Sequence, residues 1–140
     1  MENKELEKLT RELHDNFSAD RFDRCLELAD ENVQIIAHAF GMTFSGRKEF
    51  GDFMHGFKQA FPDMKLEHQN ILSSGNKVAV EFVVTGTHTG MLQTPAGGVP
   101  PSGKKVSLHV AEFYQWENGR FTKMSNYQDA GSLMKQISAL

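Results

Sequence analysis

Apolar residues at the start of the chain recur every three or four positions, a spacing that is typical of amphipathic helices. The first apolar stripe consists of Leu6, Leu9, Leu13 and Phe17. A second helix follows, with Ser18 or Asp20 as its cap. Its apolar stripe consists of Phe22, Cys25, Leu26 and Ala29. Polar residues at 30–32 interrupt this pattern, and a short strand is predicted over Val33–Ala37.

A third helical stripe is almost wholly aromatic. Ser45 can cap this helix after a loop or short strand over residues 41–46, and Pro62 ends it. Its apolar face consists of Phe50, Phe53, Met54, Phe57 and Phe61. One interpretation is that the whole face is ordinary core; the sharper one is that part of it, with Phe53 and Phe57, lines a cavity.

From Met64 onward the pattern changes to that of strands. Met64–Leu72 and Lys77–His88 are two predicted strands joined by a polar turn, and the second has a nearly continuous apolar centre. Thr89–Lys104 contains every proline after Pro62 and is long enough to be a functional loop.

A long hairpin follows this loop. Val106–Trp116 and Arg120–Asp129 are rich in β-branched and aromatic residues and flank an Asn118-Gly119 turn, which is a strong hairpin signal. A short closing helix is expected over Ala130–Leu140. Helices followed by long antiparallel strands favour an α+β fold. We expect one domain over residues 1–140, in which a curved antiparallel sheet wraps around helices as a cone with one open mouth.

Composition narrows the function classes. The chain has 140 residues, 39% of them hydrophobic, and a net charge of −3 without a basic stripe, so we expect no nucleic-acid partner. No apolar stretch is long enough to span a membrane, and Met1–Glu5 is charged rather than signal-like. With a single cysteine, Cys25, these features predict a cytoplasmic protein. The eleven phenylalanines suggest a core or pocket with flat apolar walls.

Spacing gives no support for a metal or cofactor. The six histidines include no His-x-His or His-x-x-x-His pair, and no cysteine pair exists. No phosphate-binding glycine motif follows a strand. We therefore expect neither a metal nor a cofactor, and we interpret Cys25 as a small core residue.

Several motifs together resemble a known family. They are Gly46 before the Phe-rich helix that ends in Phe61-Pro62-Asp63, then Gly86-Thr87-His88-Thr89-Gly90, Pro100-Pro101-Ser102-Gly103-Lys104, the Glu112-Phe113 strand with its Asn118-Gly119 turn, and Tyr127-x-Asp129. The chain resembles the SnoaL-like polyketide cyclase and ester cyclase family of the nuclear transport factor 2-like superfamily, from roughly residue 5 to 138.

The resemblance implies a cone-shaped, cystatin-like α+β barrel with a hydrophobic pocket, usually a homodimer packed through the outer sheet face. Cyclases of the family close a ring of a polyketide ester by intramolecular aldol condensation, without metal or cofactor. The resemblance implies that Asp129 takes the position of their acid/base aspartate. Fold alone does not fix function, because the superfamily serves many purposes.

Asp129 is therefore the leading catalytic candidate. An apolar site would raise the pKa of its carboxyl and allow it to act as both base and acid. The alternative is that Asp129 caps the helix that begins near Ala130, which would lower the same pKa. Strand alternation puts Tyr127 on the same face, where its hydroxyl could donate to a substrate oxygen.

Other polar residues have weaker cases. His109 could bind substrate or orient Asp129, or it could be a satisfied core or interface histidine. Glu112 is three residues away, so it is expected on the opposite face, at a dimer interface or in solvent. His88 would contact substrate or anchor the long loop. Candidates for the pocket mouth are His38 and His55, whereas His14 and His68 are interpreted as surface residues.

The function that these features predict is cofactor-free acid/base isomerisation or aldol cyclisation of an apolar carbonyl compound, an isomerase or lyase activity. The first alternative is a protein of the same fold that binds a small ligand without turnover. The others are a partner-binding module and a hydrolase of epoxides or esters. A hydrolase would need a positioned water and further polar groups beside Asp129.

Overall fold

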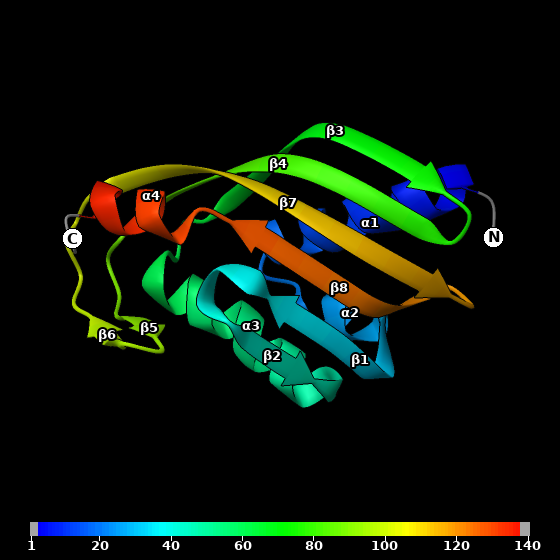
Figure 1. Cartoon of the computed structure of the whole chain (residues 1–140), viewed down its shortest axis with the longest axis horizontal. Helices are drawn as coiled ribbons and strands as arrows, with labels where there is room; N and C mark the ends of the chain where they lie inside the picture. Colours follow the sequence, from blue (N-terminus) through cyan, green and yellow to red (C-terminus); the bar gives the residue numbers. More distant parts are fainter. Residues whose placement is uncertain (1–2, 138–140) are drawn as a thin grey trace.

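Helices and strands follow the order that the hydrophobic pattern predicts (Figure 1). The computed structural model describes residues 3–137. The helices are α1 (Asn3–Ser18), α2 (Phe22–Glu27), the 3₁₀ turn η1 (His38–Phe40), α3 (Gly46–Ala60) and α4 (Ala130–Gln136). The strands are β1 (Ala29–Ala37), β2 (Met42–Ser45), β3 (Lys65–Ser74), β4 (Lys77–Thr87), β5 (Leu92–Thr94), β6 (Gly97–Val99), β7 (Lys105–Glu117) and β8 (Arg120–Gln128).

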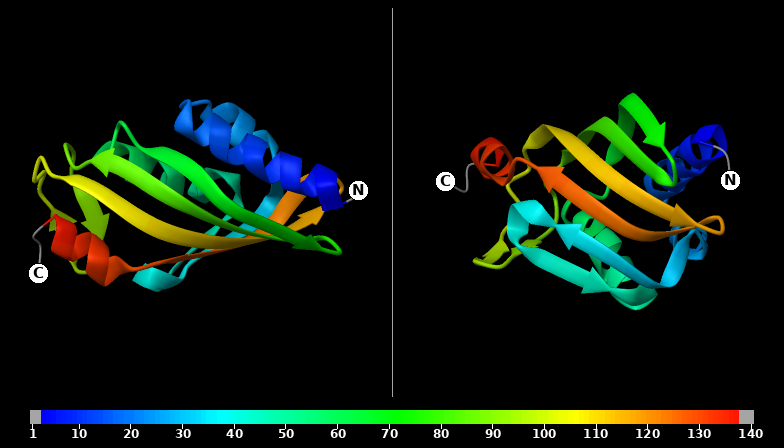
Figure 2. Two further views of the ribbon diagram at one scale, coloured as in Figure 1. Left: turned by 90° about the horizontal axis from the view of Figure 1, so that it is seen from above. Right: turned by 45° about the vertical axis from the view of Figure 1, so that its right-hand side comes forward.

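The main sheet has six strands in the order β2-β1-β8-β7-β4-β3. Strands β3, β4, β7 and β8 pair antiparallel, as the sequence predicts, and β1 adds parallel to β8. Helices α1, α2 and α3 lie against one face of this twisted, curved sheet (Figure 2). The α+β fold class is therefore confirmed, with one parallel pairing that the sequence did not predict.

Several boundaries differ from the predictions. Helix α2 ends at Glu27, before Ala29, and its N-cap is Arg21 rather than Ser18 or Asp20. Strand β1 begins at Ala29 rather than Val33, because Phe121 donates its backbone N–H to Leu28 and ties the chain to β8 before a bulge. The predicted loop at residues 89–104 contains the small β5–β6 hairpin. Helix α4 is observed to Gln136, and the last residues of the predicted helix, 138–140, lie outside the described part of the chain.

The core lies between the helices and the inner face of the sheet. Strand β7 alternates strictly, so that Val106, Leu108, Val110 and every second residue to Trp116 are buried. Trp116 donates its indole N–H to the Thr10 hydroxyl of α1 at 3.2 Å, which fixes this helix against the sheet.

Cys25 is fully buried, as predicted, and burial raises the pKa of its thiol to about 12. Between residues 3 and 137 no helix is long and apolar enough to cross a membrane.

Candidate functional site

A cavity lies between α1, α3 and the inner face of the sheet. It is narrow, with a volume of about 80 Å³, and it is open at one side. Its apolar walls include Leu13, Phe17, Phe50, Phe53, Met54, Phe57, Phe61, Met64, Leu66, Phe82, Val84, Val106, Leu108, Val110, Met124 and Leu133. Both predictions for the aromatic face of α3 and its C-cap hold in part. Phe50 and Phe61 are buried core residues, and these two phenylalanines line the cavity together with Phe53 and Phe57.

One part of the cavity wall is polar, and Glu112 is at its centre. Glu112 of β7 is 6% exposed and is the only buried carboxylate among residues 3–137. Asn126 lies directly opposite it on β8 and donates from Nδ2 to Oε2 at 2.7 Å. Tyr114 donates its hydroxyl to Oε1 at 2.5 Å. His14 Nε2 lies 2.9 Å from the same oxygen and 2.9 Å from the Tyr114 hydroxyl.

These contacts set the charge of the Glu112 carboxyl. Burial raises its pKa, but the hydrogen bonds from His14, Tyr114 and Asn126 and the positive charge that His14 can carry outweigh burial. The pKa of Glu112 therefore lies below its usual value, and the buried group is a carboxylate at neutral pH. Burial and the adjacent carboxylate raise the pKa of Tyr114 well above its usual value, so its hydroxyl remains a donor.

Two further residues extend the polar cluster at opposite ends. Gln128, which also lines the cavity, donates from Nε2 to Oδ1 of Asn126 at 3.0 Å. His68 of β3 places its Nε2 2.7 Å from Nδ1 of His14. The polar cluster, defined here as His14, His68, Glu112, Tyr114, Asn126 and Gln128, thus joins α1 to strands β3, β7 and β8.

Local sequence explains how the cluster is assembled. Alternation along β7 puts Glu112 and Tyr114 on the same inner face as Val110. Along β8 the inner residues are Met124 and Asn126. On α1, His14 lies one turn after the buried Thr10, so both face the sheet. The predictions that Glu112 faces solvent or an interface and that His14 is a surface residue are wrong, and His68 is half-buried.

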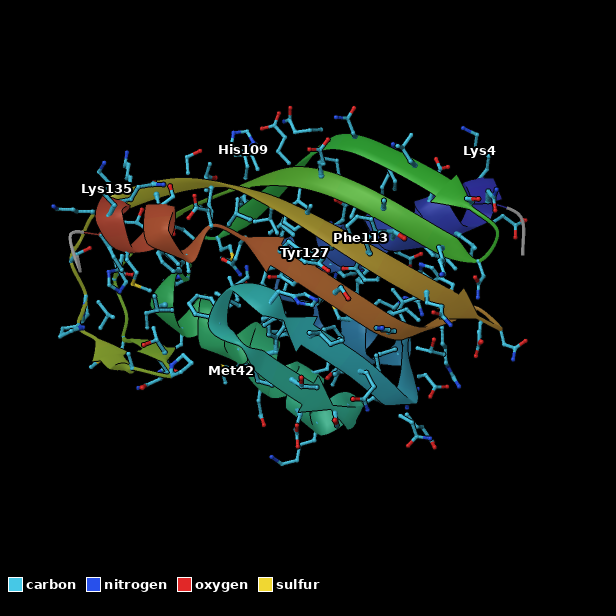
Figure 3. All side chains as sticks on the ribbon, in the orientation of Figure 1. Lys4, Met42, His109, Phe113, Tyr127 and Lys135 are labelled. Carbon is cyan, nitrogen blue, oxygen red and sulfur yellow. The ribbon has the colours of Figure 1, made fainter. Side chains whose placement is uncertain are left out.

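Asp129 has a different position from the one predicted. Its side chain is exposed, and Oδ1 accepts the backbone N–H of Ser132 at 2.9 Å, so Asp129 caps α4. Tyr127 is 45% exposed and, with His109 and Asp129, lines an open groove on the outer face of the sheet. Figure 3 shows Tyr127 and Phe113 together on this outer face. The expected inward orientation of Asp129 and Tyr127 is therefore wrong, because Asn126 rather than its neighbour Tyr127 faces the cavity.

The remaining predicted histidines lie apart from the cavity. His38 stacks on Tyr127, with ring centroids 4.2 Å apart, on the outer face. His55 packs edge-on against Phe22, between α3 and α2. His88 is fully buried, and its Nδ1 lies 2.9 Å from the Ser102 hydroxyl, so it anchors the long loop to the end of β4.

Within residues 3–137, no three His, Cys, Asp or Glu side chains are grouped so that they could hold a metal ion. The polar cluster itself has two imidazoles, but their facing nitrogens bond to each other and Nε2 of His14 bonds to Glu112 and Tyr114. The arrangement is therefore suited to holding and moving protons.

A curved sheet with helices on one face and a cavity between them, with one buried carboxylate among residues 3–137, defines the class as a small α+β domain with an internal cavity. The model of the SnoaL-like polyketide cyclase family matches residues 7–137, and the chain belongs to this family. No curated protein matches the sequence.

Solved structures agree on the fold. AclR from Streptomyces galilaeus, a candidate hydroxylase, is 22% identical with a TM-score of 0.86, covering 99% of this chain and 84% of its own. A SnoaL-like polyketide cyclase candidate from Jannaschia is 21% identical with a TM-score of 0.87, covering 99% and 94%. A protein with a ketosteroid isomerase-like fold from Catenulispora acidiphila, in complex with trimethylamine, is 15% identical with a TM-score of 0.78, covering 93% and 92%.

Proposed function

We propose that the protein is a cofactor-free acid/base enzyme for an apolar carbonyl compound, with Glu112 as its proton-transfer group. The observation that carries this proposal is the one carboxylate that is buried within the described part of the chain, on the wall of an aromatic cavity. Three side-chain donors bond to its two oxygens. Such fixed donors hold the carboxylate in one orientation before a substrate arrives.

The reaction begins with proton transfer from substrate carbon to Glu112. Its Oε2 accepts from Asn126 and retains a lone pair, which takes the proton from the carbon beside a carbonyl. The electron pair of the broken C–H bond moves onto the carbonyl oxygen, and an amide N–H of Asn126 or Gln128 stabilises this enolate. In an isomerisation, Glu112 returns the proton to another carbon. In an aldol closure, the enolate carbon attacks a second carbonyl of the same molecule, and Glu112 protonates the new alkoxide.

The low pKa of Glu112 restricts the substrate. A carboxylate that three donors stabilise is a weak base, so the carbon that it deprotonates must itself be acidic. Carbon beside or between carbonyl groups meets this condition. The aromatic walls favour a flat, largely apolar molecule around that group.

The test uses 2-tetralone, a flat ketone, in D₂O, with deuterium uptake beside its carbonyl followed by proton NMR. We expect Glu112→Gln to lower the catalysed exchange by about 100-fold or more, because positioned proton-transfer groups typically supply that factor. The matched control is Asp129→Asn, which retains a capping side chain outside the cavity and should exchange like the wild type.

Three results would contradict this assignment. Full exchange in Glu112→Gln would exclude Glu112 as the base. Loss of exchange in Asp129→Asn alone would restore Asp129 to the role that the family resemblance implies. If 2-tetralone shifts the NMR signals of cavity residues but the wild type exchanges no faster than buffer, the cavity binds ketones without acid/base catalysis.

A second candidate function is binding of a small ammonium compound without turnover. A carboxylate in a cavity that the rings of Phe82 and Tyr114 also line is a favourable site for an alkylammonium ion, and the Catenulispora relative was solved with trimethylamine. Titration with trimethylamine separates the candidates. Saturable binding that Glu112→Gln abolishes, without any 2-tetralone exchange in the wild type, would favour the ammonium site.

We also propose that the outer sheet face pairs two copies of the chain, as the family resemblance implies. This face exposes Phe113 at 53% and Tyr127 at 45%, and their rings contact each other edge to face, with centroids 5.9 Å apart. Aromatic side chains that are exposed together are typical of protein interfaces.

A further inference from the structure

His68 is the one member of the polar cluster that is neither fully buried nor part of the cavity wall. It belongs to the edge strand β3 and is half-buried beneath α1, whereas its partner His14 is 3% exposed. Its Nε2 lies 2.7 Å from Nδ1 of His14, and the ring planes differ by 10° with centroids 4.9 Å apart. This centroid separation is so much longer than the N···N distance that the rings lie end to end in nearly one plane and not face to face. Imidazole N–H groups and lone pairs lie in the ring plane, so coplanar rings align the N–H of one with the lone pair of the other.

We propose that His14 and His68 form a proton wire that connects the buried Glu112 carboxyl with solvent. The wire begins at Oε1 of Glu112, 2.9 Å from Nε2 of His14, and continues from Nδ1 of His14 to Nε2 of His68. Nδ1 of His68 is the end that exchanges with water. This rests on the proposed function, in which deuterium uptake by a substrate requires the proton that Glu112 takes from carbon to exchange with solvent before Glu112 returns it.

The transfer balances in protons and charge. When Glu112 is protonated, its proton moves to Nε2 of His14, the proton on Nδ1 of His14 moves to Nε2 of His68, and the proton on Nδ1 of His68 moves to water. Glu112 becomes a carboxylate and a hydronium ion forms outside. Both imidazoles begin this transfer as neutral Nδ1–H tautomers and end it as neutral Nε2–H tautomers, in which His14 donates to the Glu112 carboxylate. Before the next outward transfer, each ring must regain its Nδ1–H form by rotating or by exchanging its ring proton. The reverse sequence delivers a proton to Glu112.

The surroundings favour this pair as the route. Tyr114 also contacts Glu112 and His14, but burial and the carboxylate keep its hydroxyl protonated, so it holds the geometry and passes no proton. Asn126 and Gln128 are amides that cannot transfer protons at neutral pH.

The groups around His68 keep its ring neutral. It faces His14, Arg11 and Asp15 from α1, Glu112 from β7 and the ring of Phe82 from β4. Burial, the positive charge that His14 carries when it is protonated and the charge of Arg11 outweigh Asp15 and Glu112 and lower the pKa of His68 to about 4. A neutral imidazole has one donor and one acceptor nitrogen, which is the state that a relay requires.

The test measures exchange of the His14 ring N–H with water by ¹⁵N-resolved NMR, without substrate. In His68→Gln the side chain can still bond to His14 but cannot relay a proton, so we expect exchange to slow by roughly 100-fold, as for loss of a positioned proton-transfer group. His109→Gln is the matched control, since His109 is exposed on the outer face; its exchange should equal that of the wild type.

A second variant separates relay from structure. His68→Ala opens a space beside His14, and added imidazole should restore fast exchange if transfer is the role of His68, whereas added toluene should not. Unchanged exchange in a folded His68→Gln, or equal effects of imidazole and toluene on His68→Ala, would overturn the wire. Because the readout needs no turnover, the wire can fail while Glu112 remains the base in the 2-tetralone assay, and the reverse can also occur.

Discussion

Two carboxylates show how the surroundings of a residue set its chemistry. Glu112 is buried among a histidine, a phenol and an amide, whereas Asp129 is exposed and bonded to the first turn of α4. The sequence allowed a capping role for Asp129, and that contact is the one observed. The sequence did not identify Glu112, because charged residues are mostly exposed. Its hydrogen-bond partners His14 and Asn126 also come from other segments of the fold, and no local sequence pattern indicates them.

The single residue His68 should also make the stability of the fold depend on pH. In the unfolded chain His68 takes up a proton near pH 6.5, whereas in the folded protein its pKa is about 4. Between these values the unfolded state binds more protons, so the free energy of unfolding should fall as the pH drops from 6.5 to 4. Urea unfolding of the wild type and His68→Gln at pH 7 and pH 5 measures this. The variant should lose less stability than the wild type over that interval, and equal losses would contradict the assignment.

At the scale of elements, the spacing of apolar residues and the residues at the turns predicted most of the fold. The helices α1 and α3 and the β7–β8 hairpin follow from apolar spacing and from Asn118-Gly119. The same alternation contained the signal for Glu112, because it shares its parity with Val110 and Tyr114 along β7. The partners of Glu112 could be identified only from the three-dimensional structure, since no sequence pattern indicates that His14 of α1 lies beside β3 and β7.

Glycines provide a test of element stability. In α3, a methyl group on Gly56 would meet nothing within 4 Å, and one on Gly51 would approach only the Leu26 side chain at 3.9 Å. Alanine at either position should therefore raise the free energy of unfolding by about 0.5–1 kcal/mol, because glycine is a poor helix former. In contrast, a Cβ on Gly90 would overlap the carbonyl oxygen of Gln59, so Gly90→Ala should be strongly destabilising. Thermal and urea unfolding of the three variants measure the difference, and a stabilised Gly90→Ala would contradict the close packing of this loop on α3.

At the scale of the whole molecule, the sheet separates two surfaces with different chemistry. The inner face and helices enclose the cavity, and the outer face carries the exposed Phe113–Tyr127 pair with His38 stacked on it. Several residues that the sequence suggested for the site lie on this outer side or at its groove: Asp129 as the catalytic candidate, and His38, His109 and Tyr127 as substrate-binding candidates. The sequence thus identified these residues as candidates, but it did not identify the face of the sheet on which they lie.

If the outer face joins two copies, Phe113→Ser should shift the protein toward the monomer in sedimentation velocity experiments. The reason is that a serine removes most of the apolar contact area at this position. Leu72→Ser is the matched control, since Leu72 is also exposed, at 71%, but lies near the end of the edge strand β3. A wild-type chain that is monomeric at all accessible concentrations would contradict the proposed pairing.

The bond between Trp116 and Thr10 gives the molecule a built-in optical reporter. Trp116 is the one tryptophan in the chain, it is 2% exposed, and its ring packs on Tyr114, a member of the polar cluster. Its indole N–H is bonded to the same helix that carries His14. Any ligand that shifts α1 or alters the charge of Glu112 will therefore change the environment of a single fluorophore, so that intrinsic emission can be used to screen unlabelled compounds for those that enter the cavity.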